Sequence, residues 1–305
     1  MNSHIAPILT QLNKVVLGKS HQVKLSVACL LAKGHLLIED LPGMGKTTLG
    51  QAIAKVFGLE FQRIQFTSDI LPADIIGTNI FDKEDGQFKF HRGPVFSQLI
   101  LGDEINRATP KAQSALLEAM EEQQVTVEGE TFALPEPFFV IATQNPSHQI
   151  GTYPLPESQL DRFLFRIELG YPDPSFERVL LKGQSGRTNL VSLEPLLEHS
   201  KLQEIQAAVN QITVSEHLLS YVMSLVNATR QSPDFAHGLS PRGGLALIAA
   251  AKAWAFLDGR DYVLPEDVQQ IFIPTVAHRL EFSQKASGGV NQLVETILEQ
   301  VAVPS

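Results

Sequence analysis

Hydrophobic positions change their spacing just past the middle of the chain. Up to about Leu169, short apolar runs alternate with stretches in which apolar residues recur every three or four positions. Strands that alternate with helices are typical of a parallel sheet covered by helices. We therefore predict an α/β fold whose parallel sheet has five strands, at His35–Glu39, Glu60–Phe66, Gln98–Asp103, Phe138–Thr143 and Phe163–Ile167.

The second part of the chain is helix-periodic almost throughout. A turn-rich break, GYPDPSFER at residues 170–178, separates it from the first part. Ser215, Ser240 and Pro265 each stand at the beginning of an apolar-periodic stretch, where they favour a helix start. We predict two domains, an α/β domain at residues 1–171 and an all-helical domain at residues 172–305.

Two further elements are indicated within the first part. Thr109 and Pro110 suit the first positions of a helix that runs to about Gln123. Directly after it, the sequence QVTVEGETFAL alternates between polar and apolar residues around Glu128 and Gly129. This pattern predicts a β-hairpin that leads into the fourth strand of the sheet.

The composition limits the classes of function. The 305 residues include 24 basic and 33 acidic side chains, a net charge of −9, so nothing indicates a surface for a polyanion. The single cysteine, Cys29, excludes a disulfide framework and a cysteine-rich zinc site. No apolar run reaches membrane-spanning length, and the first residues lack the pattern of a signal peptide. We expect a soluble, cytoplasmic protein that neither binds nucleic acid nor inserts into a membrane.

A glycine-rich turn connects the first predicted strand to a helix. Its sequence, EDLPGMGKTTL at residues 39–49, follows the phosphate-binding pattern G-x-x-x-x-G-K-S/T except that Asp40 replaces the first glycine. We expect Asp40 to make the bend with a positive φ. Lys46 would contact the phosphates of ATP, and the Thr47 hydroxyl would bind Mg²⁺. A strand–helix turn without a ligand is the alternative. The predicted nucleotide-binding residues are Pro42, Gly43, Met44, Gly45, Lys46, Thr47 and Thr48.

Polar residues end the third and fourth predicted strands. The run SQLILGDEINRA delivers Asp103 and Glu104 to the carboxyl edge of the sheet, where ligands bind in open α/β folds. Asp103 would lie near Mg²⁺, and Glu104 would polarise the attacking water. Asn145 follows the fourth strand and could hydrogen-bond the γ-phosphate or that water. A solvated acidic strand end and an Asn-Pro turn are the simpler alternatives.

These segments together resemble the MoxR group of AAA+ ATPases. The resemblance covers nearly the whole chain and rests on EDLPGMGKTTL, RIQFTSDILPADIIG, the run from FKFHRGPVF to LLEAMEE, FFVIATQNP, GTYPLPESQLDRFLFRI, LSPRGGLAL and VLPEDVQQIFIPTVAHRL. It implies an AAA+ P-loop NTPase core followed by a helical lid. It also implies that an acid in the first P-loop position is compatible with activity.

The resemblance assigns further roles to single residues. Asn145 matches sensor I, Arg162 the arginine finger that reaches a neighbouring subunit's nucleotide, and Arg242 sensor II of the lid. Gly18 closes the segment VVLG, which resembles the stretch that flanks the adenine. The alternatives are an ion pair of Arg162 with Asp161 or Glu157, and a helix-terminal Arg242 without a ligand. Whether Arg242 serves its own or a neighbouring nucleotide stays open.

The resemblance also implies a purpose. Members of the group form ring-shaped homo-oligomers, typically hexamers, that use ATP to remodel or mature a client protein, often with a von Willebrand factor A domain partner. Residues 78–96 look like the loop inserted in the second helix, and residues 125–134 like a hairpin that faces the pore or partner; both could equally be solvated excursions. A DNA-translocating motor and a non-hydrolysing scaffold are the alternative functions. The hairpin, which carries no Lys or Arg, disfavours the motor.

Overall fold

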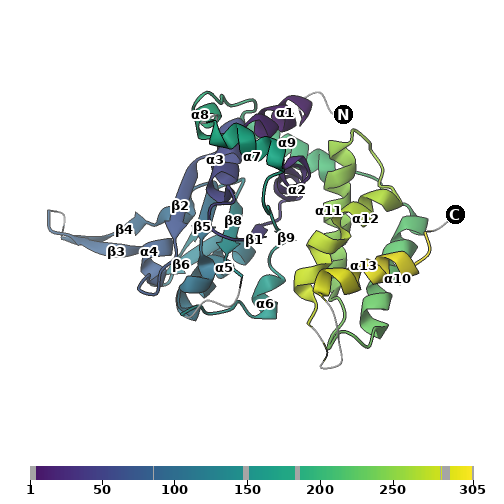
Figure 1. Cartoon of the computed structure of the whole chain (residues 1–305). Helices are drawn as coiled ribbons and strands as arrows, with labels where there is room; N and C mark the ends of the chain where they lie inside the picture. Colours follow the sequence, from purple (N-terminus) through teal and green to yellow (C-terminus); the bar gives the residue numbers. More distant parts are fainter. Residues whose placement is uncertain are drawn as a thin grey trace.

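A parallel five-stranded sheet forms the centre of the first part of the chain (Figure 1). The computed structural model describes residues 5–84, 86–146, 151–182, 186–281, 283 and 289–303, so the outermost residues of both predicted domains lie outside the described part. The strands follow the order β2-β5-β8-β1-β9 and all pair in parallel. They are β1 (Leu36–Glu39), β2 (Phe61–Gln65), β5 (Leu99–Asp103), β8 (Phe139–Gln144) and β9 (Phe165–Ile167). The predicted strands and the parallel sheet are confirmed.

Alternate residues of each strand pack into different cores on the two faces of the sheet. Leu99 and Leu101 belong to one buried cluster, whereas Ile100, between them, belongs to the other. Side chains alternate across a strand, so a strand covered on both faces must be apolar throughout. Helices α1 (Ile5–Val15), α2 (Ser20–Leu31) and α3 (Lys46–Val56) cover the first face, and α4 (Pro72–Ile76) and α5 (Pro110–Glu122) the second.

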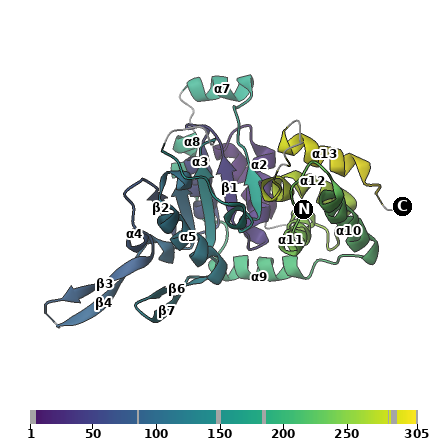
Figure 2. The same ribbon diagram turned by 90° about the horizontal axis from the view of Figure 1, so that it is seen from below.

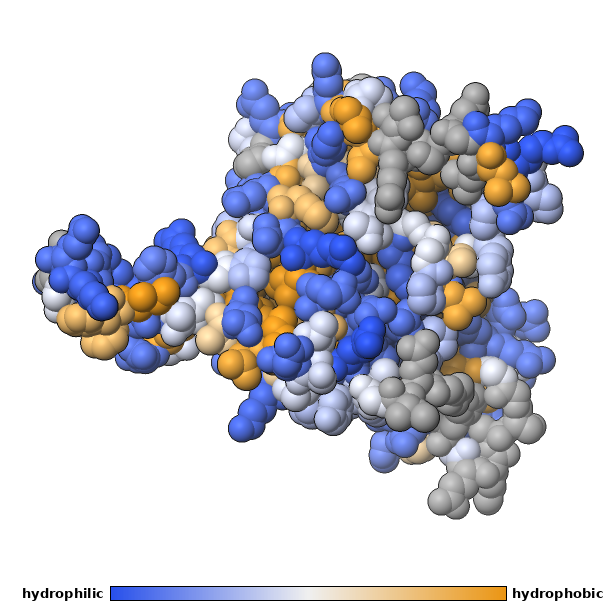
Figure 3. Space-filling view, turned by 60° about the vertical axis from the view of Figure 1, so that its left-hand side comes forward, coloured by the Kyte–Doolittle hydropathy of each residue, from blue (hydrophilic) through white to orange (hydrophobic). Residues whose placement is uncertain are grey.

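Two β-hairpins project from the second face (Figure 2). The predicted one consists of β6 (Gln124–Val127) and β7 (Glu130–Ala133). The other consists of β3 (Gly77–Asp82) and β4 (Gln87–Arg92), so our description of residues 78–96 as an inserted loop is wrong for most of its length. Stacking of Phe90 on Phe132, with ring centroids 4.2 Å apart, joins the hairpins. On the protruding β3–β4 hairpin, apolar and polar surface lie side by side (Figure 3).

Helices make up almost all of the second part. They are α7 (Pro174–Leu181), α8 (Gly186–Val191), α9 (His199–Asn210), α10 (Glu216–Gln231), α11 (Pro241–Leu257), α12 (Pro265–Val276) and α13 (Val290–Gln300), with a short 3-10 turn at Ala277–Arg279. The first part contains in addition α6 (Glu157–Leu160), which precedes β9, and 3-10 turns at Pro94–Phe96 and Ile105–Arg107. The predicted helical second part is confirmed. Because α8 lies against α1 and α3 of the first part, the exact boundary after residue 171 stays a prediction.

The helix starts follow the sequence in most cases. Ser215 accepts a hydrogen bond from the backbone N–H of Leu218, and Ser240 accepts one from Gly243. Thr109 occupies the cap position of α5, but its side chain makes no cap hydrogen bond, so that expectation is wrong. Among the helices in the described ranges, none is both long and apolar enough to cross a membrane.

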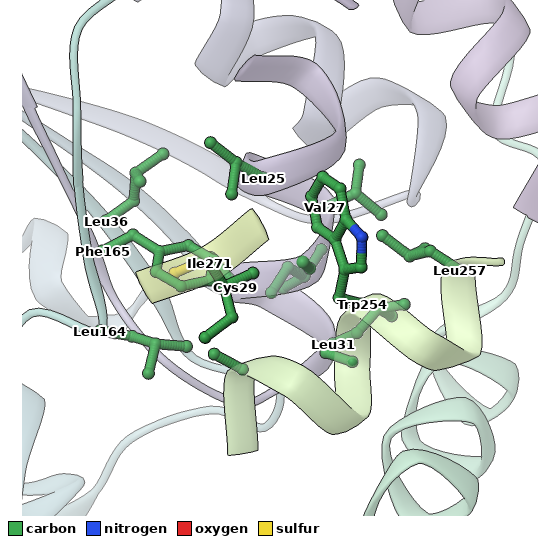
Figure 4. Close-up of a cluster of buried hydrophobic side chains, with 14 of the residues drawn as sticks. Leu25, Val27, Cys29, Leu31, Leu36, Leu164, Phe165, Trp254, Leu257 and Ile271 are labelled. Carbon is green, nitrogen blue, oxygen red and sulfur yellow. The ribbon is translucent and has the colours of Figure 1, made fainter. Parts of the chain in front are cut away.

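Helix α2 connects the cores of the two parts. It is buried on nearly all sides, because one side packs on the sheet and the other on the lid helices. Leu25 and Cys29 lie beside Phe165 of β9, whereas Val27 and Leu31 lie beside α11 with its Trp254 (Figure 4). The thiol of Cys29 is fully buried, and burial raises its pKa. This cysteine is therefore a packing residue.

Candidate functional site

The carboxyl edge of the sheet opens into a cavity of about 950 Å³. The loop after β1, the end of β5 and the residue after β8 all contribute to its wall, as expected where parallel strands end side by side. The lining contains every loop residue predicted to bind nucleotide, together with the three predicted strand-end residues. These are Pro42, Gly43, Met44, Gly45, Lys46, Thr47, Thr48, Asp103, Glu104 and Asn145.

The loop after β1 has the backbone geometry of an anion cradle. Gly43 and Gly45 have φ values of 87° and 93°, a region that residues with a Cβ rarely adopt. An added Cβ would meet nothing within 4 Å at either position, so backbone conformation and not space requires glycine here. Helix α3 starts at Lys46 with Gly45 as its cap, so its unpaired N–H groups and its dipole favour an anion in the cavity.

Asp40 has a different role from the one we expected. The residues with side chains and positive φ in the described ranges are Lys33, Glu104, Gln123 and Glu128, so Asp40 does not make a left-handed bend. Its carboxylate accepts hydrogen bonds from the backbone N–H groups of Leu169, at 2.7 Å, and Gly170, at 2.6 Å. The acid therefore ties the start of the loop to the segment after β9.

Lys46 is buried at the base of the cavity. Its ammonium donates to the carbonyl oxygens of Asp40, at 2.6 Å, and Leu41, at 3.2 Å. Burial lowers the pKa of this ammonium, and the nearby carboxylates of Asp40, Asp103 and Glu104 oppose that shift. A phosphate chain above the loop would supply the further negative charge that a buried cation favours.

Asp103 is held by two neighbouring strands. Its Oδ1 accepts from the Thr143 hydroxyl of β8 at 2.6 Å, and its Oδ2 pairs with Arg63 of β2 at 2.5 Å. Thr47, whose hydroxyl was predicted to bind Mg²⁺, lines the same cavity. One carboxylate, one hydroxyl and the oxygens of a bound phosphate chain are a donor set that suits Mg²⁺.

Glu104 stands out by its backbone conformation. It lies in the left-handed region, with φ 58° and ψ 48°, which costs an ordinary residue on the order of 1 kcal/mol or more. Its backbone N–H donates to the Thr143 hydroxyl. Its carboxylate accepts from Asn145 at 3.1 Å, Gln65 at 3.2 Å and Arg107 at 2.9 Å. These contacts fix the carboxylate in the wall of the cavity that Lys46 also lines.

The opposite wall of the cavity comes from two segments that are distant in sequence. Residues 15–17 and Lys19 line it, and so do residues 170–172. Gly18 has a φ of 72° and stands between these lining residues, and an added Cβ there would come within 2.7 Å of the Phe176 ring. Lys19 donates to the carbonyl oxygen of Tyr171 and so joins the two segments. This wall is the place that the sequence indicated for an adenine.

Arg162 and Arg242 do not line this cavity. Both lie in a second cavity of about 310 Å³, whose described lining shares no residue with the first. Each arginine pairs with Glu121 of α5, Arg162 at 2.6 Å and Arg242 at 3.1 Å. The alternative ion pair of Arg162 with Asp161 or Glu157 is therefore wrong. We call Arg162, Arg242 and Glu121 the arginine face.

Sequence reasoning missed several side chains that touch the predicted ones. Arg63 and Gln65 alternate on β2 and so point to one side, toward Asp103 and Glu104. Their polar alternation at a strand end was a usable signal, but only the strand order places β2 beside β5. The buried Thr143 and the acid Glu121 gave no signal, because their partners are distant in sequence.

Family models match both parts of the chain. A model described as the ATPase family associated with various cellular activities (AAA) matches residues 35–165, and an AAA lid domain model matches residues 227–301.

Several known proteins are similar over almost the full length. Chaperone MoxR1 of Mycobacterium tuberculosis is 41% identical, over 96% of this chain and 81% of its own. Uncharacterized protein YeaC of Bacillus subtilis is 45% identical, with coverages of 96% and 92%. Protein MoxR of Paracoccus denitrificans is 32% identical, with coverages of 96% and 94%. A crystal structure from Cytophaga hutchinsonii, described as a candidate ATPase, has a TM-score of 0.90 at 39% identity and coverages of 99% and 95%.

Proposed function

Because this chain belongs to the MoxR family of AAA+ ATPases, we propose that it binds ATP with Mg²⁺ in the larger cavity and hydrolyses it. One observation carries this proposal: the Glu104 carboxylate is oriented by Asn145 in the wall of the cavity that Lys46 also lines. A base that activates water and a cation that binds phosphates thus share one cavity.

The described side chains divide the work among them. Lys46 exchanges its loop carbonyls for phosphate oxygens, and Glu104 orients a water and accepts its proton while Asn145 keeps the carboxylate in place. Thr47 and Asp103 would hold the magnesium ion. Arg63, which pairs with Asp103, must then share this carboxylate with the ion or lose the ion pair. When bound, Mg²⁺ neutralises charge on the phosphates. The wall at residues 15–19, with Gly18, receives the adenine.

We propose further that the active site is shared between subunits of a ring, with six members as the expected number. Arg162 and Arg242 lie apart from the nucleotide cavity of their own chain, and both carry guanidinium groups that bind phosphate oxygens well. A neighbouring copy that places this face over the cavity would supply positive charge where negative charge develops during hydrolysis. Both arginines therefore act on the neighbour's nucleotide.

The purpose of hydrolysis is the remodelling or maturation of a client protein. This part of the proposal rests on the name chaperone that one relative carries and on the two joined hairpins, which form a projecting surface. A protein with a von Willebrand factor A domain is the partner we would test first. Because the activity requires ATP, we place the protein in the cytoplasm.

The alternative functions make different predictions. A DNA-translocating motor needs cations that contact phosphates, and the tip of the β6–β7 hairpin carries Glu128 and Glu130 instead. We expect no duplex-DNA binding at physiological salt, and micromolar, salt-sensitive affinity would support the motor. A scaffold that binds ATP without turnover has no use for an oriented Glu104. Release of phosphate in the presence of Mg²⁺ would exclude it.

Mixing of two inactive variants tests the shared site. Lys46→Ala removes the cation that holds the phosphates, whereas Arg162→Ala leaves ATP binding intact but removes charge stabilisation worth on the order of a thousandfold in rate. Each variant alone should be nearly inactive. After subunit exchange, verified by native mass spectrometry, some interfaces combine an intact loop with an intact arginine and should recover phosphate release. If exchange is complete and no activity returns at any ratio, the site is not shared.

The client is tested with Glu104→Gln, which should keep ATP and its client bound. A protein that co-purifies with this variant from the native host should dissociate when the nucleotide is removed. A co-purifying protein that stays bound without nucleotide would contradict ATP-dependent remodelling.

A further inference from the structure

The arginine face contains one acid that holds both arginines. Oε2 of Glu121 pairs with Nη1 of Arg162 at 2.6 Å, and Oε1 of the same carboxylate pairs with Nη2 of Arg242 at 3.1 Å. Arg162 follows α6 in the α/β part, whereas Arg242 begins α11 of the lid. One carboxylate therefore joins a residue of the sheet domain to a residue of the lid.

The position of Glu121 in its helix requires cations nearby. It lies in the last turn of α5, where the unpaired carbonyl groups already carry partial negative charge and an acid is unfavourable. Arg162 pairs with Glu121, and its Nη1 also donates to the carbonyl oxygen of Leu117, one turn earlier in α5, at 2.7 Å. The end of α5 and Glu121 thus form a negatively charged seat for guanidinium groups.

Comparison with Arg279, in the same cavity, shows that Arg162 is not an ordinary structural arginine. The side chain of Arg279 is only 4% exposed, and all three of its nitrogens donate to Asp161 or to backbone carbonyls. The side chain of Arg162 is 27% exposed and uses Nη1 alone. Within the described part of the chain, Nη2 of Arg162 and Nη1 of Arg242 have no hydrogen-bond partner.

Each guanidinium is therefore held at one end and free at the other. We propose that Glu121 is a positioning residue that sets Arg162 and Arg242 side by side, so that they reach the neighbouring nucleotide as one pair. The pair keeps a surplus of one positive charge, because a single carboxylate balances two guanidinium groups. A planar guanidinium held by one Nη still offers its other Nη to a phosphate oxygen. This inference rests on the shared site proposed above.

The opposite role for Glu121 would be to keep the two arginines away from the neighbouring nucleotide. If Glu121 withheld the arginines from the neighbour, its removal would raise the ATPase rate. If it positions them, its removal leaves two mobile side chains, and displacement of a catalytic group by about 1 Å costs on the order of a hundredfold in rate. We therefore expect Glu121→Ala to lower kcat by about tenfold to a hundredfold, with the KM for ATP unchanged within about twofold. Glu121→Gln keeps one acceptor oxygen and should recover part of the loss.

Mixing assigns Glu121 to one side of the interface. Glu121→Ala subunits keep their own loop, and Lys46→Ala subunits keep an intact arginine face, so the mixture should regain ATPase activity as Arg162→Ala with Lys46→Ala does. Glu122→Ala removes the same charge one residue later, and Glu122 makes no ion pair among the described residues. This control should keep the parental kcat. ATP binding and thermal unfolding verify that each variant is folded.

The outcomes separate the two proposals. A parental or raised kcat in Glu121→Ala, or a loss equal to that of Glu122→Ala, overturns the positioning role. So does a mixture of Glu121→Ala with Lys46→Ala that stays inactive while Arg162→Ala with Lys46→Ala recovers, because Glu121 would then not belong to the arginine side. If neither mixture recovers after exchange, the shared site itself fails, and this inference fails with it.

Discussion

The nucleotide cavity and the arginine face both present cations to a phosphate chain but are built in different ways. The cavity takes its chemistry from the ends of neighbouring parallel strands, so short motifs contain its main residues. The arginine face joins α5, the end of α6 and the start of α11, which are far apart in sequence. The cavity combines a glycine-turn anion cradle with a buried lysine, whereas the arginine face presents two guanidinium groups outside that cavity. If the active site is shared as proposed, binding is a property of one subunit and turnover a property of two.

The largest effect should come from Lys46→Ala. The lysine that directly follows the glycine turn is then lost, and we expect ATP affinity to fall by at least about a hundredfold, since charge-assisted hydrogen bonds to phosphate are among the strongest in proteins. Arg162→Ala, as the matched change in the arginine face, should leave ATP affinity within about twofold. Titration with a fluorescent ATP analogue measures both. Equal losses in the two variants would break the distinction between the sites.

Glu104→Gln should separate binding from chemistry within the cavity itself. The amide keeps the shape of the side chain but cannot accept a proton, so we expect the hydrolysis rate to fall on the order of a hundredfold to ten thousandfold. ATP affinity should survive, since Lys46 and the loop are unchanged. Single-turnover phosphate release, measured beside ATP binding, decides. A variant that turns over at the parental rate would remove Glu104 from the mechanism.

The sequence predicted the cavity better than the arginine face for a physical reason. Lys46, Asp103 and Glu104 follow directly from a glycine turn or a strand, so local spacing predicts both their element and the edge of the sheet at which they lie. Glu121 pairs with residues 41 and 121 positions away, and no local pattern reports such a contact. Asp40 shows the limit even inside a motif: its position was evident, but its partners at Leu169 and Gly170 depend on β9 lying beside β1. The β3–β4 hairpin was missed because resemblance suggested a loop, although its phenylalanines alternate as in a strand.

A smaller effect should follow from Asp40→Asn and Asp40→Gly. Both remove the charge-assisted hydrogen bonds to the segment after β9, and such bonds contribute about 1.5–3 kcal/mol each when a charged group takes part. We expect a lower unfolding temperature and ATP affinity reduced by about threefold to tenfold, because the loop loses its anchor. Asp261→Asn removes an exposed acid as a control. Asp40→Gly restores the usual first residue of a P-loop, so binding as tight as in the parent would show that the anchor is unimportant.

The last prediction concerns the pH dependence of stability, to which a histidine beside the arginine face contributes. His35 lines the cavity of the arginine face, whereas no histidine occurs in the described lining of the nucleotide cavity. Its Nδ1 accepts from the N–H of Val140, and its Nε2 lies 3.3 Å from the carbonyl oxygen of Met120, one residue before Glu121. A second ring proton would face the Val140 N–H. Burial accordingly lowers the pKa of His35 from 6.5 to about 4.

The sign of the pH effect follows from these two pKa values. Between about pH 6.5 and 4 the unfolded chain binds a proton at this imidazole and the folded protein does not, so the free energy of unfolding falls as the pH falls. At pH 5 the loss should be on the order of 2 kcal/mol from His35 alone. His35→Gln keeps an acceptor and a donor without titrating, and its denaturant-measured stability should depend less on pH than that of the parent between pH 7.5 and 5. His217→Gln, at an exposed position of α10, should follow the parent curve. If His35→Gln also follows the parent curve, burial of this imidazole does not contribute to the pH dependence of stability.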